Sequence, residues 1–198
     1  MHLAEQLGSF AGQLTETALK AVTITYAGRA ASLNTRPVTQ VAIASLLRPL
    51  LSSINMVNAL TVARSRNIDV TIVTHEQVEG YQTSIQLEVT SESGTREVTG
   101  TLFQDQEPRL VSIRQIPMEA RLGSRMLYVR NQDRPGLIGA LGRTLGDAEV
   151  NIATFHLGRD RPGGDAIALV EVDQPVEQPV LDRIADLPQV LYVKQLAF

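Results

Sequence analysis

Two series of side chains alternate without a break over residues 81–90, and this pattern limits the fold of the chain more than any other feature. One series consists of Tyr81, Thr83, Ile85, Leu87 and Val89, and the other of Gln82, Ser84, Gln86, Glu88 and Thr90. A period of two is typical of a strand with one buried and one exposed face. Residues 91–94 have the composition of a hairpin turn, and strands are expected at 95–103 and 109–116. The sequence therefore predicts an antiparallel meander.

Helical patterns precede this meander. One amphipathic stripe consists of Leu3, Leu7, Phe10, Leu14 and Ala18, at the spacing of a single helix face. Residues 21–27 alternate as a strand does, and Asn34 is placed to cap a helix that ends before Pro49. A shorter helix is expected over residues 57–66, with Val57 facing inward. The first 117 residues are thus expected to form an α+β domain.

Strand periodicity stops after residue 117, and residues 118–125 are expected to form the junction to a second domain, residues 126–198. Strands are expected in that domain at 126–131, 151–158, 165–173 and 190–196, and helices at 136–147 and 179–187. The core stripes of the two helices are Leu137, Ile138, Leu141 and Leu145, and Val180, Leu181, Ile184 and Leu187. This βαββαβ order is typical of the ferredoxin-like fold. Because so small a unit leaves a sheet face or edge to be covered, we expect it to self-associate.

A group of three polar residues, one proline and one glycine surrounds the expected start of the first helix of this domain. Its members are Asn131, Asp133, Pro135, Gly136 and Asn151. Pro135 presets the first helical turn and Gly136 allows close approach to the backbone, so the next amides can face a carboxylate. Asp133 is suited to accept a hydrogen bond from an ammonium group, and Asn131 or Asn151 to recognise a hydroxyl. The sequence predicts a pocket for a small zwitterion, with the three polar side chains gathered where the strands meet the helix. Helix capping by Asp133 and a turn role for Asn151 are the alternative.

Composition excludes several classes of function. The chain has no cysteine, so disulfides, thiolate nucleophiles and cysteine-ligated metals are excluded, and its three histidines are too scattered for a metal site. A net charge of −3 and a pI near 5.6 argue against nucleic acid and anionic membranes as partners. No apolar run approaches the roughly 18 residues of a membrane span, and the N-terminus lacks a signal pattern. We therefore expect a cytoplasmic protein.

No motif for catalysis or nucleotide binding is found. Gly136, Gly139 and Gly142 lack the spacing of a dinucleotide site, and we expect them to serve close helix packing. A nucleophile elbow and a Walker loop are also missing. The sequence predicts no catalytic residue, no metal and no cofactor in this chain, which is not expected to be an enzyme by itself.

The run Asn-Gln-Asp-Arg-Pro-Gly at 131–136, followed by Asn151-Ile152, resembles the regulatory ACT domain, an amino-acid sensor of βαββαβ fold. Residues 134–147 and 150–160 resemble the C-terminal end of long-form D-3-phosphoglycerate dehydrogenases. Residues 1–117 resemble the intervening, or allosteric substrate-binding, domain of the same enzymes. The stretches that support this second resemblance are Leu3-Ala-Glu-Gln-Leu-Gly-Ser-Phe-Ala-Gly-Gln-Leu, Asn34-Thr-Arg-Pro, Leu47-Arg-Pro-Leu-Leu and Gly100-Thr-Leu-Phe.

This resemblance implies a regulatory module whose catalytic and NAD-binding domains precede it in the family. Those domains oxidise 3-phosphoglycerate with NAD, and L-serine, the product of the pathway, binds between paired ACT domains and inhibits the enzyme. Asp133 and Asn151 match the serine-binding positions of the family. Asn131 falls where other members carry histidine or an aromatic residue. The resemblance therefore implies L-serine and a second copy of the chain as partners, in a dimer or tetramer.

The resemblance also implies an anion site, which some members carry in the intervening domain. Arg109 and Arg121 match two of its basic positions, and Glu171 replaces a third. Two other interpretations of the chain remain open. It could be the small subunit of an iron-sulfur L-serine dehydratase, although the Ser-Ser-Ser-His-Thr motif of that family is missing. It could also be a purely structural oligomerisation module.

Overall fold

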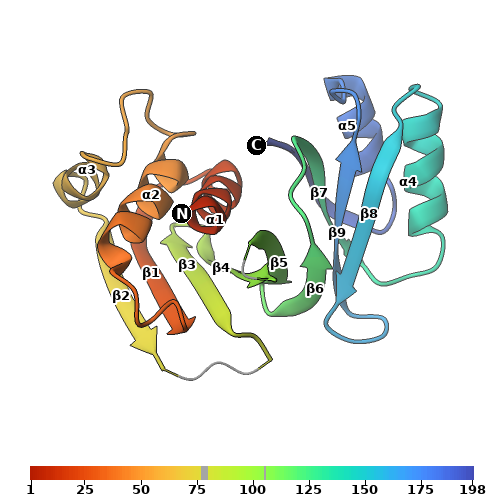
Figure 1. Cartoon of the computed structure of the whole chain (residues 1–198). Helices are drawn as coiled ribbons and strands as arrows, with labels where there is room; N and C mark the ends of the chain where they lie inside the picture. Colours follow the sequence, from red (N-terminus) through yellow and green to blue (C-terminus); the bar gives the residue numbers. More distant parts are fainter. Residues whose placement is uncertain (77–79, 105) are drawn as a thin grey trace. The chain divides into compact units, whose positions relative to one another are not determined.

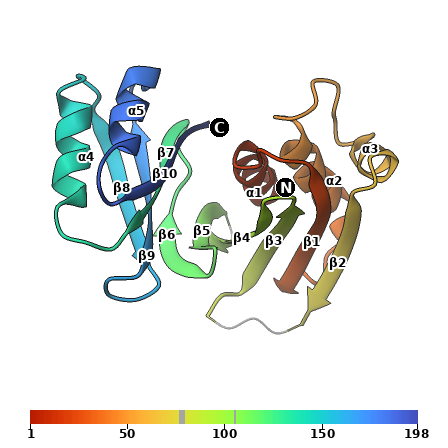
Figure 2. The same cartoon turned by 180° about the vertical axis from the view of Figure 1, so that it is seen from behind.

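The computed structural model describes residues 1–76, 80–104 and 106–198. These residues form two compact units, Met1–Gln115 and Ile116–Phe198, which are drawn from opposite sides in Figures 1 and 2. The α+β class predicted from the sequence is confirmed, because helices and strands are mixed in both units.

Helices and strands alternate at the start of the first unit, and a run of strands ends it. In chain order the elements are α1 (His2–Gln13), β1 (Leu19–Gly28), α2 (Thr35–Leu47), α3 (Ala59–Ser65), β2 (Asp69–His75), β3 (Thr83–Ser91), β4 (Gly94–Phe103) and β5 (Glu107–Ile113). The strands lie in the order β2-β1-β3-β4-β5, with α1 and α2 on one face (Figures 1 and 2). The pairs β1–β3, β3–β4 and β4–β5 are antiparallel, as the meander predicts. β2 adds one parallel pair with β1, reached through α2 and α3.

Two glycines let α1 approach the backbone of α2 closely. A Cβ added to Gly8 would lie 2.3 Å from the carbonyl oxygen of Ala42, and one added to Gly12 would lie 2.2 Å from that of Leu46. Real Cβ atoms do not approach oxygen so closely, because interiors are packed to van der Waals distance. The contact between the two helices therefore depends on hydrogen in place of a methyl group at both positions.

We expect Gly12→Ala to destabilise the first unit by about 1 to 3 kcal/mol, as overpacking does elsewhere. The added methyl group meets backbone atoms of Leu46, which cannot rotate away as a side chain can. Urea denaturation followed by hydrogen exchange at β1 and β3 measures the change. Gly146→Ala in the second unit is the matched control, since nothing lies within 4 Å of its added Cβ. Equal stability of the Gly12→Ala and wild-type proteins would contradict the close contact.

Two predicted helices differ from the observed ones at their ends. The apolar stripe of α1 was expected to reach Ala18, but the helix ends at Gln13. The Thr15 hydroxyl donates to the Ala11 carbonyl at 2.8 Å and the Arg96 guanidinium donates to that of Leu14, so side chains replace the next helical turn.

The short helix α3 begins later than expected, and the inward role predicted for Val57 is wrong. Asn55 Oδ1 accepts from the Val57 and Asn58 amides at 2.9 and 3.1 Å, which holds this segment as a turn. Val57 is consequently 81% exposed, and Ala59 and Ala63 are the buried residues of the helix.

The second unit has the predicted βαββαβ order. Its elements are β6 (Ile116–Ala120), β7 (Arg125–Gln132), α4 (Leu137–Gly146), β8 (Ile152–Arg159), β9 (Asp165–Val172), α5 (Gln178–Ala185) and β10 (Val190–Ala197). Strands β7 to β10 form an antiparallel sheet in the order β10-β7-β9-β8. This is the strand order of the ferredoxin-like fold, which is thereby confirmed. The expectation that strand structure stops after residue 117 is wrong, because β6 continues to Ala120.

The core of the second unit lies between one face of this sheet and its two helices. Leu141 and Leu145 of α4 pack in one cluster with Val180 and Ile184 of α5 and with inward residues of β7 and β9. Ile138 was predicted in the same stripe but is 56% exposed. The buried positions of α4 are Leu137, Leu141 and Leu145, a narrow stripe at intervals of four that leaves Ile138 on the flank.

The opposite face of the sheet carries β6. A Cβ added to Gly158 of β8 would lie 2.5 Å from the carbonyl oxygen of Pro117 and 3.1 Å from Met118 Cβ. β6 therefore lies across the face of β8, while β8 and β10 remain the two edge strands of the sheet.

Candidate functional site

The carboxylate of Asp133 is held by two donors just beyond the end of β7. Arg159 Nη1 donates to Oδ2 at 2.8 Å, and the backbone amide of Gly163 donates to the same oxygen at 3.0 Å. The backbone amide of Asp133 donates in turn to the Gly164 carbonyl at 2.8 Å. Within the part of the chain that the structure describes, Oδ1 of Asp133 accepts no hydrogen bond. Asp133 thus anchors the turn between β8 and β9 by one oxygen and leaves the other available.

Charge and hydrogen bonding keep this carboxylate ionised. The Gly163 amide and, after it, the Arg159 guanidinium hold the pKa of the Asp133 carboxyl below its ordinary value. The predicted alternative, in which Asp133 caps the following helix, is wrong, because its side chain turns to β8 and the residue that precedes α4 is Gly136.

Gly136 opens the start of α4. It has a φ of 100° and a ψ of −20°, a left-handed conformation that favours glycine. No side chain caps the helix there, and the nearest atom to an added Cβ is Gln189 Nε2 at 3.7 Å. The same nitrogen donates to the Pro135 carbonyl at 3.3 Å. The start of α4 therefore lacks a side-chain cap, and the positive end of the helix dipole lies next to the exposed Gly136.

Asn131 lies deeper than its predicted role requires. It is 1% exposed, its Nδ2 donates to the Gln132 carbonyl at 2.9 Å, and its Oδ1 has no partner among the described residues. A buried amide oxygen without a donor is unfavourable. Asn131 can meet a ligand at this oxygen only after the atoms that cover it move.

A row of residues across the sheet connects these features. Asn131 of β7 is level with Ala166 of β9, and Ala166 is level with Arg159 of β8. All three point to the face that carries the helices, since Leu127 and Val129 of the core alternate with the same parity as Asn131. The row ends where Arg159 reaches Asp133. Sequence patterns assign no role to Arg159, because only the register of three strands shows that a residue so far along the chain lies beside Asp133.

Asn151 lies at the other end of the sheet. It precedes Ile152, the first residue of β8, whereas Arg159, the contact of Asp133, is the last. The eight residues of β8 span roughly 23 Å at the usual rise of a strand. The prediction that side chains 131, 133 and 151 gather in one chain is therefore wrong. The error is topological, because the strand that follows α4 starts at the opposite end of the sheet from the start of α4.

Local bonds hold Asn151 in place. Its Nδ2 donates to Asp173 Oδ2 at 2.6 Å, and its backbone amide donates to Gln174 Oε1 at 2.9 Å. The residue is exposed and bridges the start of β8 to the segment after β9.

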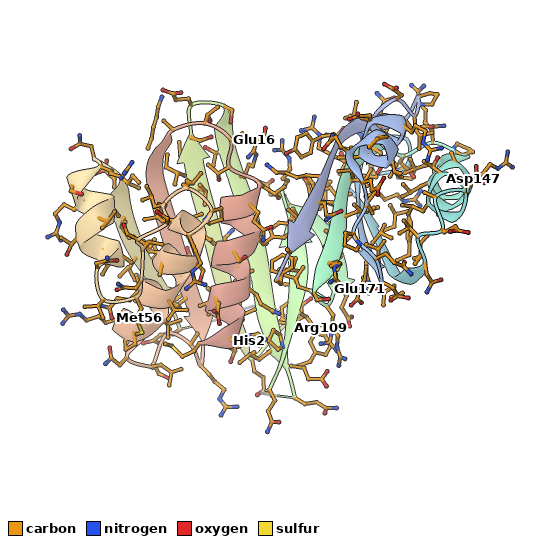
Figure 3. All side chains as sticks on the ribbon, turned by 90° about the horizontal axis from the view of Figure 1, so that it is seen from above. His2, Glu16, Met56, Arg109, Asp147 and Glu171 are labelled. Atoms are coloured by element: carbon orange, nitrogen blue, oxygen red, sulfur yellow. The ribbon has the colours of Figure 1, made fainter. Side chains whose placement is uncertain are left out.

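The residues predicted for an anion site are engaged with other groups. Arg109 Nη2 lies 2.7 Å from Glu107 Oε2, and the guanidinium carbon of Arg109 lies 5.6 Å from the centre of the Phe103 ring. Glu171 Oε2 accepts from the Thr154 hydroxyl at 3.3 Å. Arg109 belongs to the first unit and Glu171 to the second, and both are labelled in Figure 3. Arg121 also belongs to the second unit. An anion at Arg109 has to compete with a carboxylate of the same strand, and the site stays a prediction.

The outer side of α4 is hollowed. A groove of about 450 Å³ is lined by Gly136, Gly139, Ala140, Arg143, Thr144 and Leu187. Nothing lies within 4 Å of a Cβ added to Gly139 or Gly142, so the close packing predicted for these glycines does not occur within the chain.

The described residues, 1–76, 80–104 and 106–198, contain no group of three or more histidines and acidic residues that could hold a metal ion. None of the helices in these ranges is long and apolar enough to cross a membrane.

Two known protein domains match two successive parts of the chain. Residues 1–114 match the D-3-phosphoglycerate dehydrogenase intervening domain, and residues 125–189 match the ACT domain. Among curated relatives, the chain is similar to D-3-phosphoglycerate dehydrogenases of Bacillus subtilis (32% identical over 193 residues), Synechocystis (33% over 186) and Methanocaldococcus jannaschii (30% over 191). These matches cover 97, 93 and 96% of this chain.

The same matches cover only 37, 34 and 36% of the relatives' own lengths. The matched families are thus those predicted from the stretches at 3–14 and 131–152, and they account for nearly all of this sequence. The chain belongs to the D-3-phosphoglycerate dehydrogenase family, of which it carries the intervening domain and the ACT domain.

Proposed function

We propose that this chain is the regulatory part of a D-3-phosphoglycerate dehydrogenase and binds L-serine between two ACT domains. Bound serine inhibits the oxidation of 3-phosphoglycerate with NAD, which catalytic domains outside this sequence perform. One observation carries the proposal. The start of α4 has no side-chain cap, and the ionised carboxylate of Asp133 close to it in sequence accepts its described hydrogen bonds through Oδ2 alone. Relatives that are phosphoglycerate dehydrogenases favour this function over the iron-sulfur serine dehydratase.

The groups at this end of the sheet match the two charges of an amino acid. Oδ1 of Asp133 accepts a charge-assisted hydrogen bond from the ammonium group. The uncapped amides at the start of α4 receive the carboxylate, and Gly136 leaves room for it. A third group is needed for the serine hydroxyl, and in one chain Asn151 is too far away to supply it.

Strand β8 provides the geometry that brings Asn151 to this site. It is an edge strand, so a second β8 can pair with it. In an antiparallel pair around a twofold axis, the start of each strand lies beside the end of the other. Asn151 of one copy then stands near Arg159 and Asp133 of the other. We propose that each serine is bound by Asp133 from one copy and Asn151 from its partner.

The surface of α4 supports the same pairing. α4 lies beside β8 in both views of the fold (Figures 1 and 2), so a copy that meets β8 also meets α4. The open sides of Gly139 and Gly142 admit a second helix at short distance. Ile138 and Leu157, which are exposed in one chain, gain apolar neighbours in the pair. The partner thereby supplies the close helix packing that the sequence predicted.

Titration calorimetry of the 198-residue chain with L-serine tests the function. We expect heat of binding and a rise of the unfolding temperature with L-serine, because a ligand of the folded state stabilises it. N-Acetyl-L-serine and L-serine amide should produce neither effect, since each lacks one of the two charges. Absence of heat and of a thermal shift with millimolar L-serine would overturn the proposal. Sedimentation that shows the same dimer with and without L-serine in that case would favour a purely structural module.

A further inference from the structure

We propose that Arg159 is a positioning residue of the amino-acid site, which fixes the Asp133 carboxylate by one oxygen so that the other faces the ligand. This inference rests on the proposed function and adds a residue to its site. Arg159 at the end of β8 and Gly163 in the following turn are the two residues by which this part of the chain acts on Asp133.

The direction of the bonds at Asp133 supports this role. Arg159 Nη1 and the Gly163 amide both donate to Oδ2, at 2.8 and 3.0 Å. Two donors on one oxygen hold the carboxylate in a single orientation, because rotation about the Cβ–Cγ bond breaks both hydrogen bonds. Oδ1 is then oriented before any ligand arrives. An acceptor that is oriented in advance binds more tightly than one that must be ordered on binding.

The turn itself is arranged to keep Arg159 in place. Asp160 Oδ1 accepts from the Arg161 amide at 2.7 Å, and the Gly164 carbonyl accepts from the Asp133 amide at 2.8 Å. Gly163 has a φ of 75°, which directs its amide toward Asp133 and favours glycine. The turn and the segment after β7 are therefore joined at three points, and Arg159 contributes the only side-chain cation among the described contacts of Asp133.

Charge balance defines the class of ligand. Arg159 and Asp133 together carry no net charge, so the pair prefers a ligand without net charge to a simple cation. A free amino acid has an ammonium group for Oδ1 and no net charge. With Asp133 alone, the site would also favour amines. Arg159 thus makes the site selective for zwitterions.

The test compares Arg159→Gln with Arg159→Lys in the 198-residue chain. We expect Arg159→Gln to weaken L-serine binding by about tenfold, the loss of one charge-assisted hydrogen bond that orders the site. Arg159→Lys keeps the cation and should recover most of the affinity. Arg161→Gln is the matched control, since Arg161 is an exposed arginine of the same turn whose described hydrogen bonds are made by its backbone amide and carbonyl. It should bind L-serine as the wild-type protein does.

A second measurement separates positioning from a general loss of structure. The Asp133 carboxyl pKa, followed by carbon NMR without ligand, should be higher in Arg159→Gln than in the wild-type protein and close to wild type in Arg161→Gln. The other charged residues of the adjoining segments are Arg134, Asp160, Arg161 and Asp165. Unchanged serine affinity or an unchanged Asp133 pKa in Arg159→Gln would overturn the inference. If the wild-type protein itself fails to bind free amino acids, the proposed function fails and the inference fails with it.

Discussion

We expect L-serine binding to be lost in Asp133→Asn and in Asn151→Ala and to return when the two chains are co-expressed. In the proposed dimer each site takes Asp133 from one chain and Asn151 from the other. Each variant alone therefore has two damaged sites. A mixed dimer has one intact site, formed by Asp133 of the Asn151→Ala chain and Asn151 of the Asp133→Asn chain. Its other site carries both substitutions. Random pairing should restore about one quarter of the sites.

The expected losses are large because, in the proposed site, both residues contact the polar ligand away from water. Removal of one partner of a charge pair that is buried on binding lowers the affinity by roughly 30-fold or more. Asp133→Asn is preferred to Asp133→Ala, since its amide oxygen can still accept from the Gly163 amide and keep the turn in place. Calorimetry on the three preparations gives both the affinity and the number of sites.

Two results would contradict the shared site. If both residues acted within one chain, every chain of the mixture would be damaged and co-expression would restore nothing. If Asn151→Ala alone bound L-serine like the wild-type protein, Asn151 would be only a residue of the turn region, held by Asp173.

We expect Leu141→Ala to destabilise the second unit by about 2 to 5 kcal/mol. Leu141 is fully buried in the cluster between the sheet and its helices, and the shortened side chain leaves a cavity that α4 and α5 can close only in part. Urea denaturation with hydrogen exchange at β7 and β9 reports on this unit alone. Arg143→Ala on the exposed side of the same helix is the control, with an expected change within about 0.5 kcal/mol. Similar stabilities for the two variants would place the core elsewhere.

The order of elements could be predicted because local patterns determine it. The alternation over 81–90 became β3, the residues around 91–94 formed the tight turn, and the six patterns of the second unit appeared in order. The predicted helix ends were wrong where polar contacts replaced a helical turn, either from a side chain distant in sequence or from a local polar turn. Arg96 at the end of α1 and Asn55 before α3 are the two clearest cases.

Only the part of the candidate site that is close together in sequence could be predicted. Asp133, Pro135 and Gly136 are close in sequence, and their arrangement follows from one turn and one helix start. Asn151 is close to the end of α4 in sequence and therefore distant from its start in space. Arg159 is adjacent to Asp133 only through strand register, which hydrophobic periodicity does not determine.

In the proposed dimer, the separation of Asp133 and Asn151 by the length of β8 links the response to serine to the concentration of the protein. A site completed by a neighbour exists only in the assembled protein, so the effector and the second chain are bound by linked equilibria. Dilution below the dissociation constant of the pair should raise the serine concentration needed for half-saturation, and serine should in turn tighten the pair. Under this proposal, the abundance of the protein also sets its sensitivity to serine, so a cell that makes little of it should respond weakly to a given serine concentration.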